Sequence, residues 1–231
     1  MEEKDKMKQV KVLVLDFDNC ILLDEETEQG SEEVKDEAWF KVYPEYNRDV
    51  LYPLLERFKK EIAGGKGDRK DIATKICKHF EFPEARISSE VDYRCERFNS
   101  AVQEGIKRIG VSQKTRDALT ALYGRVPVYV NTGTPRDGAL ESLQALDLLT
   151  YFKEVYGRPG TKAGNLRDIA AAESVSLDEI LFMDDQHSGW LAAQEVGCRF
   201  VGIHTARNYA WHNDDQPFKV IRLLSELLEM F

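Results

Sequence analysis

The sequence predicts an α/β fold: a Rossmann-like parallel sheet core flanked by helices, with a small α-helical domain inserted after the first strand. Two observations support this prediction. Short runs of Val, Ile, Leu and Phe alternate with helical patterns in the second half of the chain, as in a parallel sheet covered on both faces. The stretch 24–110 instead carries helical patterns without strand-like runs. We therefore expect a core domain of residues 1–23 and 111–231, and an inserted helical domain of residues 24–110.

The expected strands of the core are its short apolar runs, and helical patterns separate the later ones. The closing segment, 220–231, repeats apolar residues at helical spacing, which is typical of an amphipathic helix that packs on a sheet. The expected strands are residues 8–15, 125–130, 152–156, 179–183 and 198–203, and the expected helices between them are residues 135–146, 162–172 and 188–196.

The inserted domain is expected to consist of four helices. Ser31, Asp68 and Ser89 suit the N-cap position of three of them, because their side-chain oxygens can accept hydrogen bonds from free backbone N–H groups. Trp39 and Phe40 are expected to fill the small core of this domain. The four expected helices are residues 31–43, 46–62, 68–80 and 89–109.

The composition excludes several classes of protein. The 231 residues include 32 Lys and Arg against 41 Asp and Glu, and a net charge of −9 argues against a general nucleic-acid binder, which needs a basic face. The four cysteines lack the CxxC spacing of a zinc site and are expected to be reduced thiols. No stretch approaches the roughly 20 apolar residues of a membrane span. We expect a cytoplasmic protein, a monomer or weak homodimer, with no nucleic-acid or membrane partner.

Polar residues follow the expected strands at the points where the strands end. Taken singly, each has a structural explanation as a turn or helix-cap residue, and Thr134 with Pro135 suits the start of the next helix. Together they fall at one edge of a parallel sheet, outside the carboxyl ends of its strands, where such sheets bind ligands. The residues concerned are Asp16, Asp18, Thr132, Gly133, Lys162, Asp184 and Asp185.

The charges of this edge point to a metal ion. Two carboxylates brought to about 4 Å repel each other by roughly 4 kcal/mol at a surface-like dielectric, so several converging acids require a cation among them. Oxygen ligands with open positions suit Mg²⁺, which keeps waters and takes a substrate phosphate. A metal, a lysine, a hydroxyl and helix-end amides around one anion are typical of a phosphoryl-transfer site.

The order of the segments DFDNC, NTGTP, K and MDD resembles the four motifs of the haloacid dehalogenase (HAD) superfamily, across the whole expected core. The run TGTPRDGALESLQALDLLTYFKEVYGRPGTK is similar to members with a helical cap inserted after the first motif, the group of phosphoglycolate phosphatase and β-phosphoglucomutase. The resemblance implies that the remaining stretch is that cap.

The resemblance also implies catalytic roles. Asp16 would be the nucleophile that forms an aspartyl-phosphate, and Asp18 the general acid and base, a role that needs a raised pKa. Thr132 would bind a phosphoryl oxygen beside the backbone amide of Gly133, and Lys162 would neutralise the nucleophile and the phosphate together.

Mg²⁺ would be held, by the same resemblance, by Asp185, Asp16 and the backbone carbonyl of Asp18. Asp184 makes this the adjacent-acid version of the last motif, and which of Asp184 and Asp185 contacts the metal directly stays open.

Three residues near the motifs depart from the common pattern or adjoin it. Cys20 stands where relatives have Thr or Val and is expected to fill the same packing position. Gly189 stands where some relatives place a further acid. His187 is expected to begin a helix rather than bind the metal.

The expected activity is Mg²⁺-dependent hydrolysis of a small phosphorylated metabolite, a sugar phosphate or a hydroxy-acid phosphate. The resemblance implies that carbon–halogen and carbon–phosphorus cleavage are not the reaction, because dehalogenases and phosphonate hydrolases of this superfamily have no alcohol to protonate and lack an acid at the position of Asp18. A phosphomutase of the β-phosphoglucomutase type, and a non-catalytic regulatory protein that binds phosphorylated ligands, remain alternatives.

Within the cap, the stretch AGGKGDRKDI combines glycines with Lys66, Arg69 and Lys70. A solvated loop between two helices explains it equally well. If the stretch binds substrate, Arg69 is the residue expected to hold a carboxylate or hydroxyl group away from the reacting phosphate.

Overall fold

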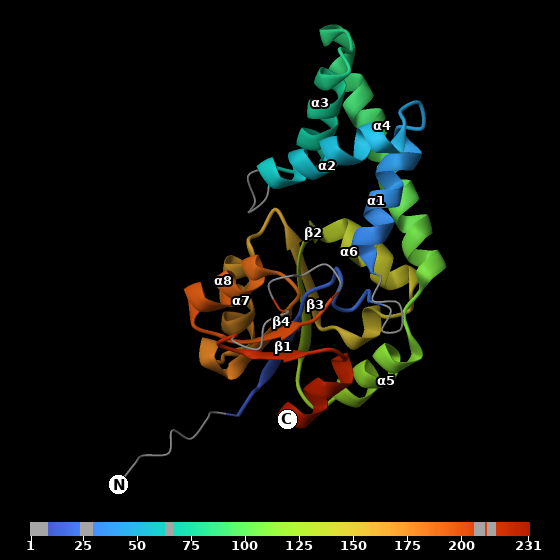
Figure 1. Cartoon of the computed structure of the whole chain (residues 1–231). Helices are drawn as coiled ribbons and strands as arrows, with labels where there is room; N and C mark the ends of the chain where they lie inside the picture. Colours follow the sequence, from blue (N-terminus) through green and yellow to red (C-terminus); the bar gives the residue numbers. More distant parts are fainter. Residues whose placement is uncertain (1–8, 24–29, 63–66, 206–210, 212–215) are drawn as a thin grey trace. The chain divides into compact units, whose positions relative to one another are not determined.

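The computed structural model describes residues 9–23, 30–62, 67–205, 211 and 216–231 (Figure 1). The chain divides into two compact units. One comprises the described residues of Met1–Glu32 and Ile109–Phe231 and is called the sheet unit; the other comprises those of Glu33–Arg108 and is called the helical unit. Within the described residues, every helix is too short or too polar to span a lipid bilayer.

The sheet unit contains six parallel strands in the order β3-β2-β1-β4-β5-β6, which confirms the predicted fold class (Figure 1). Strand β1 lies between β2 and β4, and all four of its residues are buried, as expected for a strand covered on both faces. The strands are β1 Val12–Leu15, β2 Val128–Pro135, β3 Glu154–Arg158, β4 Ile180–Asp184, β5 Arg199–Ile203 and β6 Lys219–Ile221.

Helices complete the sheet unit. Side chains of α7 and α8 pack in one apolar cluster with Val12 and Val14 of β1. Leu13 and Leu15 alternate with these residues, so they point to the opposite face of the sheet, and they are fully buried there. The helices are α5 Gln113–Leu122, α6 Arg136–Ala145, α7 Lys162–Glu173 and α8 His187–Val196, with short 3₁₀ helices η1 Leu149–Tyr151, η2 Leu177–Glu179 and η4 Leu224–Met230.

The C-terminal segment differs from the expected amphipathic helix over 220–231. Its first residues form strand β6, in which Val220 is paired with Gly202 of β5, and its remainder is the 3₁₀ helix η4. Leu224 and Leu227 of η4 are buried, and their spacing of three residues fits a 3₁₀ helix as well as an α-helix. The apolar periodicity was therefore real, but it did not distinguish the two helix types.

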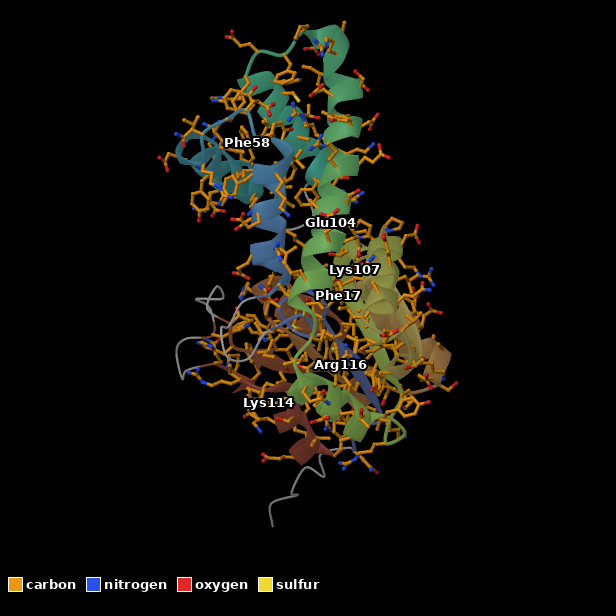
Figure 2. All side chains as sticks on the ribbon, turned by 90° about the vertical axis from the view of Figure 1, so that its right-hand side faces the viewer. Phe17, Phe58, Glu104, Lys107, Lys114 and Arg116 are labelled. Carbon is orange, nitrogen blue, oxygen red and sulfur yellow. The ribbon has the colours of Figure 1, made fainter. Side chains whose placement is uncertain are left out.

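The helical unit contains α1 Ser31–Val42, which begins with the last two residues of the sheet unit, α2 Arg48–Ile62, α3 Arg69–His79 and α4 Glu84–Ile109, which ends at the first residue of the returning chain. Trp39 is buried in its core with its ring centroid 4.5 Å from that of Phe98, and Phe58 packs in the same core (Figure 2). The expected core role is confirmed for Trp39, whereas Phe40 is partly buried and packs against that core.

The predicted N-caps have different outcomes. Asp68 caps α3, because its side chain accepts hydrogen bonds from the backbone N–H groups of Lys70 and Asp71. The prediction that Ser89 is an N-cap was wrong, since α4 already begins at Glu84. Ser31 lies inside α1 as its first residue, and its hydroxyl has a different partner, described below.

Candidate active site

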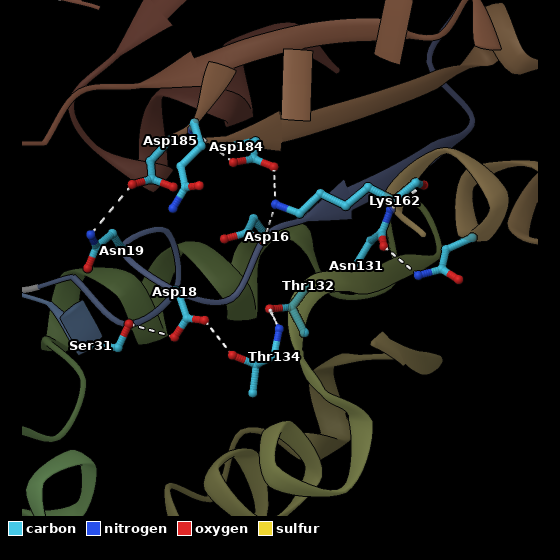
Figure 3. A network of polar contacts seen from close by, with 12 residues as sticks. Asp16, Asp18, Asn19, Ser31, Asn131, Thr132, Thr134, Lys162, Asp184 and Asp185 are labelled. Atoms are coloured by element: carbon cyan, nitrogen blue, oxygen red, sulfur yellow. Dashed lines mark hydrogen bonds and ion pairs between the residues drawn. The ribbon is translucent and has the colours of Figure 1, made fainter. Parts of the chain in front are cut away.

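The Lys162 ammonium lies between two carboxylates at the carboxyl ends of the central strands (Figure 3). Its Nζ is 2.7 Å from Oδ1 of Asp16, which directly follows β1, and it also donates a hydrogen bond to Oδ2 of Asp184, the last residue of β4. Lys162 reaches this position as the first residue of α7, whose N-cap is Thr161. Segments 146 residues apart in the sequence, at Asp16 and Lys162, therefore meet as the strand-end pattern predicts.

Asp16 also lies close to a second group of side chains, which includes Asp185. The carboxylates of Asp16 and Asp185 and the thiol of Cys20 each offer one ligand atom, and these atoms all lie within 4.8 Å of one another. All three residues are buried. The Asn19 amide donates a hydrogen bond of 3.5 Å to Oδ2 of Asp185 (Figure 3). Asp184 is not in this group, so the two adjacent acids face different neighbours.

The Asp18 carboxylate is held by two hydroxyl groups. Ser31 donates to Oδ1 and Thr134 donates to Oδ2, both at 2.6 Å. Thr134 therefore does not cap the next helix as expected: Pro135 occupies the N-cap position of α6, which has no side-chain cap. A hydroxyl can donate a hydrogen bond to an ionised carboxylate or accept one from a protonated carboxyl, so this pair can serve Asp18 in either state.

Thr132 and Gly133 lie near the end of β2, the strand that also carries Thr134. Thr132 is buried, and its Oγ1 accepts a hydrogen bond of 3.1 Å from the backbone N–H of Thr134, while Gly133 is exposed. The neighbouring Asn131 donates to the backbone carbonyl of Lys162 at 2.9 Å, and Asn165 donates to Asn131 at the same distance. Asn131 and Asn165 thus fix the backbone from which Lys162 extends.

Glycine at position 189 leaves room for Asp184. A Cβ built on Gly189 would lie 2.0 Å from Oδ2 of Asp184, which is far inside any real contact. Oδ1 of the same carboxylate accepts a hydrogen bond of 2.9 Å from the backbone N–H of Gln186. His187 begins α8, as predicted. The departure at Gly189 is therefore a steric requirement of this site.

The site's electrostatics are dominated by buried acid. Burial, the largest cause, raises the pKa of Asp16 from 3.8 to about 8; the Lys162 ammonium opposes this shift, and the carboxylates of Asp184 and Asp18 add to it. Burial followed by Asp184 and Asp16 raises the pKa of Asp185 well above its ordinary value. Burial lowers the pKa of Lys162, but Asp16 and Asp184 outweigh it and raise that pKa overall. One lysine does not compensate all these carboxylates, so a further cation would stabilise their ionised forms.

The donor set fits a divalent cation that prefers oxygen. Asp16 and Asp185 offer two buried carboxylates close to each other, and Asp184 is turned towards Lys162. Carboxylate oxygens are the ligands that Mg²⁺ takes in proteins, usually one or two of them together with waters.

The basic residues of the predicted cap stretch belong to the helical unit. Arg69 begins α3, and its guanidinium donates a hydrogen bond to the side-chain oxygen of Asn99. Lys70 forms an exposed ion pair of 2.7 Å with Asp92. Lys66 lies outside the described residues. The role of Arg69 in binding substrate stays a prediction.

Comparisons with known proteins found a match in structure but none in sequence. No protein-family model matches the chain, and neither does any curated protein. Bacillus subtilis YfnB, assigned as a HAD hydrolase and solved with bound magnesium, is similar with a TM-score of 0.70 at 14% identity, over 96% of this chain and 99% of that one.

Two further solved structures are similar over nearly their whole length. A Thermotoga maritima protein assigned as a β-phosphoglucomutase has a TM-score of 0.68 at 18% identity, over 95% of this chain and 97% of that one. A Haemophilus somnus protein predicted to be a phosphoglycolate phosphatase has the same TM-score, 0.68, and identity, 18%, over 97% of this chain and 99% of that one. The chain therefore has the fold of the haloacid dehalogenase superfamily hydrolases.

Proposed function

We propose that the protein is a Mg²⁺-dependent HAD phosphatase that hydrolyses a small phosphate monoester through an aspartyl-phosphate on Asp16. The observation that carries the proposal is the placement of Asp16, which lies against the Lys162 ammonium on one side and in a ligand group with Asp185 on the other. Asp18, two residues further on, offers a second carboxyl group at the same strand end.

In the first step, a carboxylate oxygen of Asp16 attacks the phosphorus of the substrate. The bond between phosphorus and the alcohol oxygen breaks, and Asp18 gives its proton to the leaving oxygen. Lys162, 2.7 Å from Asp16, would offset the charge of the transferred group. The hydroxyl of Thr132 and the amide of Gly133, on the adjacent strand, are available to bind phosphoryl oxygens.

In the second step, water attacks the phosphorus of the aspartyl-phosphate, Asp18 takes the proton of the water, and the bond to Asp16 breaks to release phosphate. Asp18 must therefore carry a proton in one step and lack it in the next. Ser31 and Thr134 support this exchange, because each hydroxyl can reverse the direction of its hydrogen bond. The two hydroxyls would also hold the carboxyl group in one orientation throughout.

Asp16 and Asp185 are the side chains that would hold Mg²⁺, with the backbone carbonyl of Asp18 as the further protein ligand. The bound ion would supply charge neutralisation between the nucleophile and the phosphate oxygens. The position of Asp184, paired with Lys162, favours Asp185 as the direct ligand and Asp184 as the residue that orients the lysine.

The substrate class follows from Asp18. A general acid at this position serves a leaving group that needs a proton, such as the alcohol of a sugar phosphate or a hydroxy-acid phosphate. The similarity to a protein assigned as a β-phosphoglucomutase favours one second candidate, a phosphomutase that returns the phosphoryl group to its sugar. Both reactions use the same residues, so only products can separate them.

The test is a screen of phosphate monoesters with Mg²⁺, run with wild type, Asp16→Asn and Asp168→Asn. Asp168 is an exposed acid on α7 outside the site, so Asp168→Asn is the matched control. We expect phosphate release by wild type and by the control, loss of release by Asp16→Asn, and a phosphorylated Asp16 in wild type after reaction with a phosphate ester and rapid acid quench.

Undiminished hydrolysis by Asp16→Asn would reject the covalent mechanism. Conversion of a sugar 1-phosphate to its isomer, with little free phosphate released, would favour the phosphomutase. Tight binding of phosphorylated ligands without turnover of any would instead favour the non-catalytic regulatory protein.

A further inference from the structure

Cys20 places a buried thiol among the proposed metal ligands. The residue lies in the turn that follows β1, is 2% exposed, and its sulfur is within 4.8 Å of carboxylate oxygens of both Asp16 and Asp185. In the described part of the chain its thiol makes no hydrogen bond. A packing residue such as Val could occupy the same volume, but it would offer no donor atom to an ion.

The donor set at this point is mixed. Carboxylate oxygens suit Mg²⁺, whereas a thiolate is a soft ligand that favours Zn²⁺ and its heavier relative Cd²⁺ and is avoided by Mg²⁺. Zinc bonds are about 2.3 Å to sulfur and about 2.0–2.2 Å to oxygen, so two such atoms on one ion lie at most roughly 4.5 Å apart. Atoms within 4.8 Å of one another need only a small shift to share an ion.

We propose that Cys20, Asp16 and Asp185 form a mixed thiolate–carboxylate site that binds thiophilic divalent cations, Zn²⁺ or Cd²⁺, in competition with Mg²⁺. Binding forms a metal–sulfur bond, breaks the S–H bond of Cys20 and releases the proton to solvent. The competition rests on the proposed function, because it assumes that Mg²⁺ uses Asp16 and Asp185. The binding of the soft cation does not depend on it.

The other cysteines allow a selective test. Cys77 and Cys95 are buried in the helical unit, and Cys198 is half-buried. Among the described residues, the group with Cys20 is the one where three His, Cys, Asp or Glu side chains could hold an ion. A cation that needs sulfur together with two carboxylates should therefore bind at Cys20, and Cys198→Ser is a suitable control.

The experiment titrates Cd²⁺ alone into the metal-free full-length protein and records the sulfur-to-cadmium charge-transfer absorbance, with affinity measured by calorimetry. For wild type and Cys198→Ser we expect one equivalent of Cd²⁺ to bind with this absorbance. For Cys20→Ser we expect the absorbance to vanish and the affinity for Cd²⁺ to fall at least roughly tenfold, the smallest loss typical when a metal site loses supporting groups. The affinity for Mg²⁺ is measured with Cys20→Val, which offers no donor atom, and should stay within about twofold of wild type, since Mg²⁺ does not use sulfur.

An unchanged absorbance in Cys20→Ser would overturn the inference, and so would an unchanged affinity for Cd²⁺. Should Cys20→Ser not fold, the ¹¹³Cd chemical shift of the wild-type complex decides, because a thiolate ligand moves it strongly downfield from the range of all-oxygen sites. A wild type that binds one Cd²⁺ through sulfur but hydrolyses no phosphate ester would retain this inference and reject the proposed function. An enzyme that hydrolyses phosphate esters but binds Cd²⁺ through oxygen alone would retain the proposed function and reject this inference.

Discussion

The two units of this protein each bury a cation between two acids, with different results. In the sheet unit, Lys162 lies between Asp16 and Asp184; in the helical unit, Arg94 lies between Glu45 and Glu90. Glu45 is 39% exposed, and although burial works to raise its pKa, hydrogen bonding by Arg94 lowers that pKa overall. Asp16 is almost fully buried, and its pKa is raised to about 8 despite its lysine.

The difference lies in how much acid each cation has to neutralise. The guanidinium of Arg94 also donates to the backbone carbonyl of Val42, and its partner Glu45 keeps access to water, which offsets the remaining negative charge. The ammonium of Lys162 faces Asp16 and Asp184 while the buried Asp185 lies beyond them. Buried carboxylates that outnumber their cations cost free energy unless a ligand neutralises them. The group in the sheet unit is therefore typical of a binding site, whereas the group in the helical unit is typical of an ion-pair network that stabilises the fold.

Replacing the two cations should separate these roles most clearly. We expect Lys162→Met to reduce phosphate release by roughly 10²–10³-fold, the usual loss when one preorganised charge is removed from a transition state. Arg94→Met should instead lower the free energy of unfolding by about 1–3 kcal/mol, a value discounted because Glu45 is partly exposed, with kcat of the folded protein nearly unchanged. Steady-state kinetics and urea unfolding measure the two effects. Loss of turnover in Arg94→Met together with normal turnover in Lys162→Met would contradict the functional role assigned to Lys162 and the structural role assigned to Arg94.

Gly189→Ala tests the close approach of Asp184. Because the new Cβ would lie 2.0 Å from Oδ2 of that carboxylate, the side chain must move and its hydrogen bond from Lys162 must change. We expect a loss of about 1–3 kcal/mol in unfolding free energy, as for other overpacked sites, with a reduced kcat. Gly138→Ala is the matched control, since its nearest neighbour would be 3.8 Å away. Equal stability and activity of the two variants would contradict the steric requirement.

Removing the hydroxyl of Thr134 should reduce activity by less than the substitutions above. Removing its hydrogen bond to the Asp18 carboxylate with Thr134→Val should lower kcat roughly tenfold, as expected for one hydrogen bond to a charged group. It should also displace the pH profile of kcat, which a purely structural residue would not do. Thr134→Ser, which keeps the hydroxyl, should restore both. If Val and Ser variants behave alike, the hydroxyl does not position Asp18.

The smallest predicted effect concerns pH and Mg²⁺. The pKa of Asp16 is raised on folding from 3.8 to about 8, so the folded protein binds this proton more tightly than the unfolded chain does. The resulting contribution to stability is complete below about pH 4 and is lost as the pH rises towards about 8. Mg²⁺ needs the ionised carboxylates, so its stabilising effect should grow over the same window.

We expect saturating Mg²⁺ to raise Tm more at pH 8 than at pH 6, by roughly 2–4 °C for each kcal/mol of added binding energy in a protein of this size. Thermal unfolding with and without Mg²⁺ measures the difference. Asp16→Asn should flatten the pH dependence. A Tm shift that is equal at both pH values would show that the acids are already ionised without metal.

Much of the sheet and of its polar edge could be predicted from the sequence, for a local reason. A strand buried on both faces is recognisable from its apolar run, and the residues that follow parallel strands meet at one edge whatever the details of packing. Asp16 and Lys162 were therefore predicted to meet. The same logic failed for the C-terminal segment, where apolar spacing alone could not separate strand β6 and a 3₁₀ helix from an α-helix.

The partners of Asp18 could not be predicted because they depend on tertiary placement. Ser31 and Thr134 both resemble N-cap residues locally, and only the folded chain shows that their hydroxyls converge on one carboxylate. Cys20 was expected only to pack, since nothing in its neighbourhood reveals that Asp185 comes within ligand distance from another strand. Cys20 alone carried a usable signal, because it lies two residues after the motif acid Asp18 and has a side chain that can bind an ion. Ser31 and Thr134 lie 13 and 116 residues from Asp18 in the sequence and carried no such signal.

Strand β1 is paired along both of its edges, with β2 on one side and β4 on the other. The backbone N–H of Asp16 itself donates to the carbonyl of Met183 at 2.8 Å. The backbone of Asp16, the proposed nucleophile, is therefore fixed to the part of the sheet with the least freedom. If the proposed function holds, the substrate has to be brought to Asp16 rather than Asp16 to the substrate. Amide hydrogens of Leu13 to Leu15 should be among the last to exchange with deuterium, whether or not substrate is bound.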